Sequence, residues 1–472
     1  MISIIKHRNF NKVALILVVA LTLQSCFVAK DYERPDLKTE TEALYRTENL
    51  PKDSLSMADV SWKTLFTDSY LQQYIEEGLQ NNMDVRIAIQ QMVAAEAYAK
   101  QGKAGYLPSL SIGPNYTHQE YSKNSQFGSI FSGGLDTYDI TANLSWEADI
   151  WGKIRSNKRA TQAAYLQSVA GHQAVKTQLI SSIANTYFNL LALDAQLEVT
   201  KQTIATRESG VETIKALKEA GQVTQVAVDQ NIAQYNSAKA LQVDIETAIF
   251  KTENTLSILL GSVPQNFKRS SLDVQKIEET IKLGVPASLL RNRPDVMAAE
   301  YGLIQSFELT NVASSSFYPS LTLTASGGLQ SLELADLFSS NSLFANIVGG
   351  LTQPLLNKRK LKTQKEVAVA QQEQALLQFK KTLLIAGNEV SNALFSYESE
   401  ARKFEFRTNE VEALRTAEAH SEELLKNGYA NYLDLLTARQ SVLSAELNVI
   451  ESTLQQLVNV VNLYEALGGG WK

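Results

Sequence analysis

The chain has 472 residues, with 44 lysines and arginines against 50 aspartates and glutamates, so its formal net charge is −6. These charges are spread along the chain and form no basic face, which argues against nucleic acid as a partner. Cys26 is the only cysteine and the four histidines lie far apart, which excludes a disulfide within the chain and argues against a metal site or a histidine-based triad. We therefore expect no metal and no other cofactor.

Residues 1–25 have the pattern of a signal peptide. Basic residues precede an apolar run from Val13 to Leu23, which is too short to cross a bilayer as a helix. The run ends in Leu23-Gln24-Ser25-Cys26, which resembles a lipobox, where the cysteine is diacylated and becomes the first mature residue. The alternative is an ordinary signal peptide with a chance cysteine. We expect a covalent lipid on Cys26, followed by an extended segment over residues 26–60.

Two copies of one pattern follow, over residues 61–275 and 286–472. Asp84-Val85 and Tyr106-Leu107-Pro108-Ser109 recur 211 residues later as Asp295-Val296 and Phe317-Tyr318-Pro319-Ser320. Gly221 and Leu260-Gly261 recur 207 residues later as Gly428 and Leu467-Gly468. Each copy reads as a helix, two strands, a very long helix and a further helix, so the chain is predicted to be one structure written twice.

Long helices are predicted over about 154–220 and 358–427, within windows that contain no proline and are rich in helix-forming residues. A helix of about 67 residues is about 100 Å long. Shorter helices are predicted over about 68–105, 223–260, 295–316 and 432–467. We expect each long helix to lie beside two shorter ones stacked end to end. An ordinary coiled coil is the alternative, but it does not account for strands at the same point of both copies.

Strands are predicted near 109–119, 137–147, 320–330 and 343–353. The first three alternate apolar and polar residues, as Leu110 and Ile112 do with Ser111, whereas the fourth is glycine-rich and alternates weakly. Their length is that of membrane-spanning strands, although two hairpins of a soluble sheet are the alternative. Four strands are too few to close a barrel, and an open sheet edge is not stable in lipid. Three chains would supply twelve strands.

Several motifs resemble those of the TolC-like outer-membrane efflux proteins, in particular the lipoprotein subgroup of resistance-nodulation-division (RND) systems, the NodT type. The resemblance covers essentially the whole mature chain. It is carried by Tyr32-x-x-Pro35, Trp146-Glu147-Ala148-Asp149-Ile150-Trp151-Gly152-Lys153, Arg291-Asn292-Arg293-Pro294-Asp295-Val296 and Phe317-Tyr318-Pro319.

The resemblance implies an α+β fold, with a long helical barrel in the periplasm and a transmembrane β-barrel of four strands per chain that closes only in a homotrimer. It implies an outer-membrane protein that works with a periplasmic membrane-fusion adaptor and an inner-membrane RND pump. The function implied is a passive exit duct for small molecules such as drugs or metal ions, so we expect no enzyme and no catalytic residues. The alternatives are a type I secretion duct and a lipid-anchored periplasmic coiled-coil scaffold.

The glycines Gly221 and Gly428 are the predicted helix-reversal points. Asp434 matches the family's tip pattern, in which an aspartate six residues after the glycine faces the constriction. Three copies of Asp434 would form a carboxylate ring that attracts cations and repels anions. Its alternative role is a helix-start carboxylate facing the positive end of the helix dipole. We expect Tyr432 and Leu433 to add an apolar constriction.

The block Arg293-Pro294-Asp295 is expected to be structural rather than functional. Proline suits the first turn of a helix, and aspartate suits the dipole of that turn.

Overall fold

The computed structural model describes residues 28–37, 44, 56–128, 134–275 and 289–472. The predicted signal peptide 1–25, Cys26 and most of segment 26–60 lie outside the described residues. The remaining chain has the predicted α+β class, with four strands between long helices. None of the described helices combines the length and the hydropathy that crossing a membrane requires.

The helices and strands occur in the same order in both halves of the chain. The first half contains α4 (Ser69–Asn81), α5 (Met83–Ala104), β1 (Ser109–Gln119), β2 (Leu135–Ala148), α6 (Lys153–Glu219) and α7 (Gln225–Leu259). The second contains α8 (Leu289–Asn292), α9 (Pro294–Ser315), β3 (Ser320–Ser331), β4 (Leu343–Thr352), α10 (Lys360–Lys426) and α11 (Tyr432–Ala466). Short helical turns are η1 (Met57–Asp59), α3 (Trp62–Leu65), η3 (Leu334–Asp336) and η4 (Ser340–Ser342). Helices α6 and α10 have 67 residues each and start 207 positions apart, which is the offset of the repeated glycines.

Two compact units make up the chain, and they do not coincide with the two repeats. One unit contains residues 93–167 and 299–379 together with the N-terminal segment to Pro35. The other contains residues 36–92, 168–298 and 380–472. Each unit therefore takes segments from both copies, so neither copy forms a compact unit of its own.

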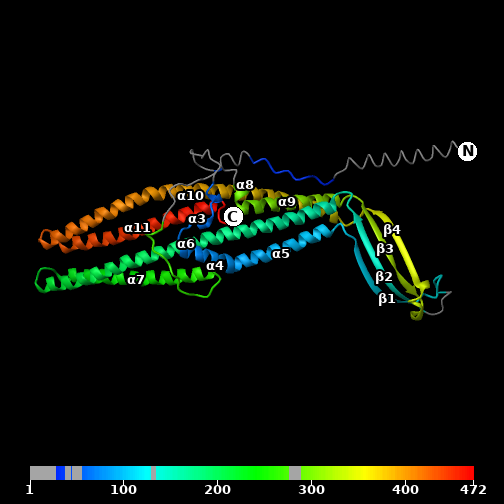
Figure 1. Cartoon of the computed structure of the whole chain (residues 1–472), viewed down its shortest axis with the longest axis horizontal. Helices are drawn as coiled ribbons and strands as arrows, with labels where there is room; N and C mark the ends of the chain where they lie inside the picture. Colours follow the sequence, from blue (N-terminus) through cyan, green and yellow to red (C-terminus); the bar gives the residue numbers. More distant parts are fainter. Residues whose placement is uncertain (1–27, 38–43, 45–55, 129–133, 276–288) are drawn as a thin grey trace. The chain divides into compact units, whose positions relative to one another are not determined.

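The sheet of the first unit is antiparallel and follows the chain order β1-β2-β3-β4 (Figure 1). Its register brings side chains of one kind to one face, because side chains alternate along each strand. Leu110, Leu144, Ala325 and Ile347 are successive partners across the four strands. Ser111, Asn143, Ser326 and Asn346 form the neighbouring polar row.

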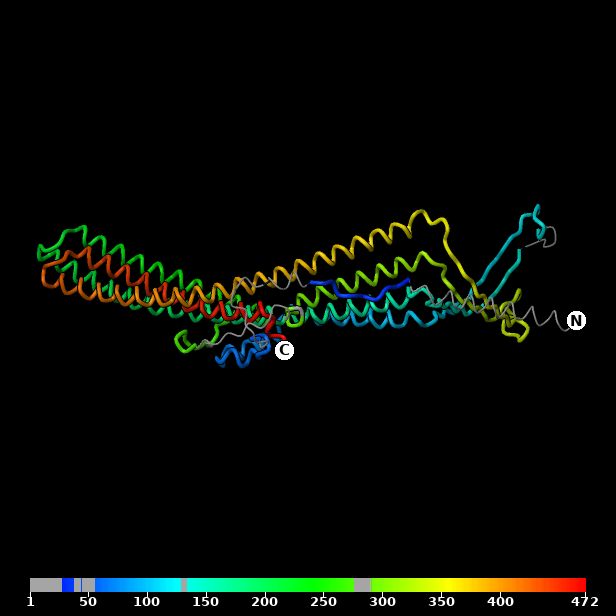
Figure 2. The backbone as a smooth tube through the Cα atoms, turned by 90° about the horizontal axis from the view of Figure 1, so that it is seen from above, coloured from blue at the N-terminus to red at the C-terminus, as the bar shows by residue number. Residues whose placement is uncertain are grey.

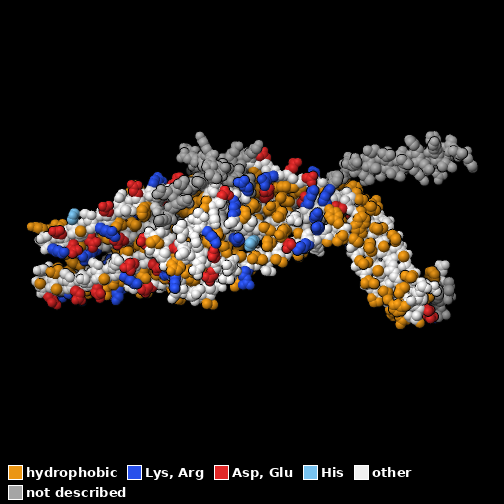
Figure 3. Space-filling view, viewed as in Figure 1, with side chains coloured by type: hydrophobic (Ala, Val, Ile, Leu, Met, Phe, Trp, Pro, Cys, Tyr) orange, Lys and Arg blue, Asp and Glu red, His pale blue; other side chains and the backbone are white. Residues whose placement is uncertain are grey.

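Apolar side chains of this sheet are uncovered in the single chain. Leu110 is 70% exposed and Ile347 74% exposed, and hydrophobic side chains spread over the sheet in Figure 3. The outer edges of β1 and β4 have no strand partner within the described residues. A sheet with an exposed apolar face and two open edges requires both an apolar surrounding and further strands.

The core of the second unit lies along the middle of α6. Ile180, Ile183, Tyr187 and Leu190 recur at intervals of three and four residues and are fully buried. The Tyr187 hydroxyl donates to Oδ2 of Asp68 over 2.8 Å, and Asp68 also accepts from the first backbone N–H groups of α4. The end of this unit at which α6 turns into α7 is also where α10 turns into α11 (Figure 2).

The helix predicted over about 68–105 is two helices, which is a correction to the sequence analysis. Asn82 follows the end of α4 with a non-helical backbone, φ −56° and ψ 133°, and its Oδ1 accepts from the N–H groups of Asp84 and Val85 at the start of α5. The same break occurs 211 residues later, where Arg293 separates α8 from α9. Asparagine at a helix start competes with continuous helix through such hydrogen bonds, and the apolar period alone does not reveal it.

Candidate functional site

The predicted reversal points Gly221 and Gly428 lie directly beyond the ends of α6 and α10. Their φ angles are +75° and +76°, in the left-handed region that favours glycine. The Gly221 N–H donates to the Lys218 carbonyl and the Gln222 N–H to the Leu217 carbonyl, each over 2.9 Å. This is a Schellman motif, and Gly428 has the same pair of bonds. Both long helices therefore end by the same local chemistry.

The helices that follow the two reversals start differently. Asn431 and Asp434 form a capping box at α11: the Asp434 N–H donates to Asn431 Oδ1 over 3.1 Å, and the Asn431 N–H donates to Asp434 Oδ2 over 3.2 Å. At α7 the side chain of Thr224 makes no capping bond. Asp434 thus has the helix-start role that was its alternative interpretation. Its side chain is also exposed, and its place in a gate stays a prediction.

A small apolar cluster joins the four helices behind the reversals. It contains Ile214, Val228, Tyr432 and Leu435, with Leu217, Val223, Ala227, Leu425 and Leu436 around it. The Tyr432 hydroxyl donates to Oδ1 of Asn231 over 2.6 Å, which connects α11 to α7. In this conformation Tyr432 packs inside the chain, whereas Leu433 is 51% exposed. The constriction predicted for these two residues stays a prediction.

Arg207 is a buried cation that the sequence analysis missed. Its guanidinium donates from Nη1 to the Gln234 carbonyl over 2.5 Å and from Nη2 to Oε1 of Gln440 over 2.6 Å. These bonds connect α6 with α7 and α11, and burial lowers the pKa of Arg207. Leu414 stands at the equivalent position 207 residues later, and this broken symmetry is the signal that could have revealed the arginine.

A second arginine ties α11 to α10 near the same end. Arg439 lies 3.2 Å from a Glu418 carboxylate oxygen and 3.4 Å from one of Glu422. Hydrogen bonding to Lys426, with a further contribution from Arg439, lowers the pKa of Glu422. Polar contacts that connect neighbouring helices thus surround the reversals.

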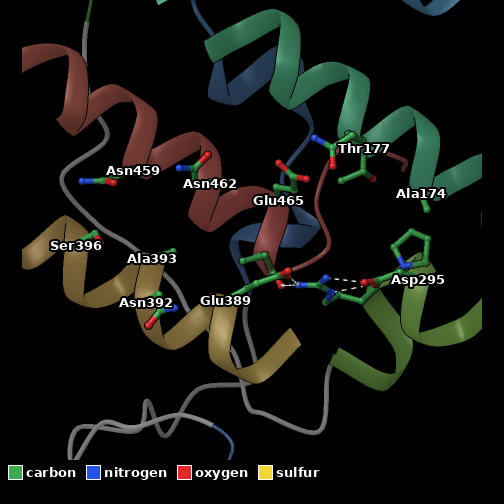
Figure 4. Close-up of a pocket in the computed structure, with 14 residues that line it drawn as sticks. Ala174, Thr177, Asp295, Glu389, Asn392, Ala393, Ser396, Asn459, Asn462 and Glu465 are labelled. Atoms are coloured by element: carbon green, nitrogen blue, oxygen red, sulfur yellow. Dashed lines mark hydrogen bonds and ion pairs between the residues drawn. The ribbon is translucent and has the colours of Figure 1, made fainter. Parts of the chain in front are cut away.

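Arg293 lies beside a polar pocket of about 500 Å³ in the second unit (Figure 4). Its side chain is 9% exposed and makes two bonds to the Asp295 carboxylate, of 3.0 and 2.6 Å, and one to Glu389, of 2.6 Å. It also donates to the Ala466 carbonyl over 3.0 Å. Burial alone would lower the pKa of Arg293, but the two carboxylates raise it by more. These contacts join three helices and fit the structural role expected of the block.

The pocket also contains a buried carboxyl group, that of Glu465. Burial raises the pKa of Glu465, which lies on α11 among asparagine side chains. Within the described residues, no group of three or more histidine, cysteine, aspartate or glutamate side chains is arranged to hold a metal.

The fold and its surfaces define a class of protein. Strands of membrane-spanning length with one apolar and one polar face are joined to helices far longer than a globular core needs. Such a chain contributes a few strands to a membrane pore and helical walls outside the membrane.

Comparison with known proteins identifies the family. The model of the outer membrane efflux protein family matches residues 74–262 and 285–469, one match in each copy of the repeat. The probable efflux pump outer membrane protein TtgC of Pseudomonas putida is 28% identical over 460 residues, covering 96% of this chain and 94% of that protein. The cation efflux system protein CusC of Escherichia coli is 26% identical, covering 96% and 98%. The open-state structure of the MtrE outer membrane channel of Neisseria gonorrhoeae has a TM-score of 0.84 at 27% identity, covering 95% and 99%.

The chain belongs to the outer membrane efflux protein family. The predicted family, fold and outer-membrane location are confirmed, and the chain is the outer-membrane channel component of an efflux system.

Proposed function

We propose that three copies of the chain form a passive exit duct for small molecules. The observation that carries this proposal is the open four-stranded sheet, whose apolar face suits lipid and whose polar rows suit water. Three such sheets joined edge to edge leave no unpaired edge. Their polar faces then line a water-filled channel.

We further propose that the duct receives its cargo from an inner-membrane RND pump through a periplasmic membrane-fusion adaptor. The names of the relatives support this, since TtgC is a probable efflux pump protein and CusC belongs to a cation efflux system. The duct itself has no catalytic step and needs no metal or other cofactor. Drugs or metal ions are the proposed classes of cargo, since CusC belongs to a cation efflux system and another relative, ArpC of Pseudomonas putida, to an antibiotic efflux pump.

Purified protein in planar bilayers tests the proposal. The expected result is a heat-resistant trimer on detergent gels and ion conductance from the same sample. Monomers or silent bilayers would contradict a channel and favour the lipid-anchored scaffold. Co-purification with a protein-secretion apparatus in place of an efflux adaptor and pump would favour the type I secretion duct.

Asp434 is proposed as the charged residue of the gate. An Asp434→Asn variant removes three negative charges from a trimer but keeps an acceptor for the Asn431 N–H, so the capping box is largely preserved. We expect a several-fold loss of preference for cations over anions in the bilayer currents. Asp229→Asn, at the start of α7, is the matched control and should leave the preference unchanged. Equal selectivity of the Asp434 variant and the wild type would remove Asp434 from the gate.

Cys26 is proposed as the site of lipid attachment. The name of one relative, the probable outer membrane lipoprotein SilC of Salmonella typhimurium, supports this. Cells labelled with radioactive palmitate should incorporate it into the wild type and not into Cys26→Ala. Equal labelling of both proteins would contradict the proposal.

A further inference from the structure

The turn from β4 into α10 contains a dense run of cations, which is an exception to the spread of charge expected from the sequence. Lys358, Arg359, Lys360, Lys362 and Lys365 occupy five of the eight positions from 358 to 365, which we call the basic segment. Arg359 pairs with Glu366 at 2.9 Å, in an exposed ion pair. Across the described part of the chain, no carboxylate comes within 4.0 Å of the ammonium groups of Lys358, Lys360 or Lys362. All five cations are exposed.

The equivalent turn of the first copy, from β2 into α6, is also basic but has carboxylate partners. Lys153 lies 3.0 Å from Glu147, and Arg159 lies 2.7 Å from Asp31 and 3.5 Å from Glu308. Lys153 and Arg159 of the first turn therefore have carboxylate partners, although Lys158 has none among the described residues. In the basic segment, Arg359 is the one cation with a carboxylate partner among the described residues.

Like charges in the basic segment repel one another, and the start of α10 adds to the repulsion. The first turn of α10 contains no acidic residue, so its cations face the positive end of the helix dipole. An external anion would relieve this repulsion.

Aromatic side chains place the basic segment at the level of lipid headgroups. Tyr106, Trp146, Phe317 and Tyr318 lie where the strands meet the helices, each between 37% and 41% exposed. Exposed tyrosine and tryptophan rings are typical of the membrane–water interface. The Lys365 ammonium lies 5.5 Å from the centre of the Phe317 ring, which connects the basic segment to this aromatic level.

Two leucines lie between the strand and the basic segment. Leu355 and Leu356 are 90% and 98% exposed, directly after β4. An apolar pair beside a cationic cluster is complementary to an anionic phospholipid, whose acyl chains are apolar and whose headgroup is negatively charged.

We propose that the basic segment binds the headgroups of anionic phospholipids, with Leu355 and Leu356 at the edge of the acyl layer. The proposal rests on the outer-membrane location of the chain and adds to its channel function a lipid preference at one of its two junctions. Lys358, Lys360 and Lys362 supply the attraction, because they have no ion-pair partner within the described chain.

Quenching of tryptophan fluorescence by brominated lipid tests the proposal. The full-length protein is reconstituted in phosphatidylcholine vesicles with a rising fraction of dibrominated phosphatidylglycerol, and quenching of Trp146 and Trp151 reports lipid at the junction. We expect the wild type to prefer phosphatidylglycerol. Combined Lys358→Gln, Lys360→Gln and Lys362→Gln substitutions should lower the preference at least about fivefold, the contribution of one lysine near an anionic surface. Raising the salt should weaken the wild-type preference.

The matched control replaces Lys201, Lys215 and Lys218, three exposed lysines of α6 in the other unit, with glutamine. It should keep the wild-type preference. The proposal is overturned if the wild type shows no preference, or if the control loses as much of the preference as the basic-segment variant.

Two other occupants of the basic segment would give different results. Stronger suppression by sodium phosphate than by sodium chloride of equal ionic strength would indicate a site for free phosphate. Loss of the trimer in the basic-segment variant would indicate that a second copy of the chain covers the segment. The basic-segment variant should keep the conductance of the wild type in planar bilayers. A loss of lipid preference with normal conductance would therefore concern the lipid site and not the channel function.

Discussion

Gly468→Ala is expected to lower the free energy of unfolding by about 3–5 kcal/mol, because the added methyl group combines a backbone clash with strain in φ. Gly468 has φ +90° and ends α11. A Cβ atom there would lie 2.6 Å from the carbonyl carbon of Asn292 and 2.9 Å from the nitrogen of Arg293. These are backbone atoms at the break between α8 and α9, so the alanine can be accommodated only if that break moves. Denaturant or thermal unfolding in detergent, followed by circular dichroism, measures the loss.

Gly428→Ala is the matched control, because the two glycines share a left-handed φ but not their surroundings. A Cβ at Gly428 meets no atom within 4 Å, so the variant carries only the backbone strain, about 1–2 kcal/mol. Equal destabilisation by the two variants would show that strain in φ, and not the contact with residues 292–293, limits this position.

The first copy should repeat this contrast. At Gly261 a Cβ would lie 2.5 Å from the Asn81 carbonyl oxygen, whereas at Gly221 it would meet nothing within 4 Å. Asn81 and Asn292 are 211 residues apart, the offset of the repeated Asp-Val motif. Both copies therefore share one contact as well as the order of their elements. The end of α7 lies against the break between α4 and α5, and the end of α11 lies against the break between α8 and α9.

Much of the fold could be predicted from the sequence, because its signals are local and occur twice. Apolar and polar residues alternate in segments such as Leu110–Ile112 because successive side chains of a strand point to opposite faces. The register confirms the prediction, since Leu110 pairs with Leu144 and Ser111 with Asn143. Gly221 and Gly428 were recognisable because a left-handed turn favours glycine wherever it occurs. The break at Asn82 was missed because a single capping side chain interrupts an otherwise helical pattern.

The contacts around the reversals could not be predicted in this way. Arg207 binds Gln234, 27 residues away, and Gln440, 233 residues away, and no spacing rule connects such positions. Asp434 was predicted from its match to the tip pattern of the family, but its bond to Asn431 depends on where α11 begins. Likewise, the boundaries of the two compact units could not be predicted. Each unit contains segments of both repeats, because packing between segments far apart in the sequence determines these boundaries.

Arg293→Met is expected to cost about 2–3 kcal/mol of unfolding free energy, the loss typical of hydrogen bonds to a charged group. Asp295 and Glu389 are 41% and 49% exposed, so water can solvate them once the guanidinium is gone, which keeps the cost below that of breaking a fully buried ion pair. The Ala466 carbonyl is the partner that loses most, because its bond to Arg293 is buried. The same unfolding experiment measures the effect.

Arg407→Met is the matched control, since Arg407 pairs with Glu410 at 2.7 Å on the exposed surface of α10. Surface pairs of this kind contribute about 0.5 kcal/mol or less. If the Arg293 variant loses no more than the Arg407 variant, the buried arginine does not hold α9, α10 and α11 together. An intermediate result from Arg293→Lys is expected, because lysine keeps the charge but lacks the planar fork that reaches two carboxylates and a carbonyl at once.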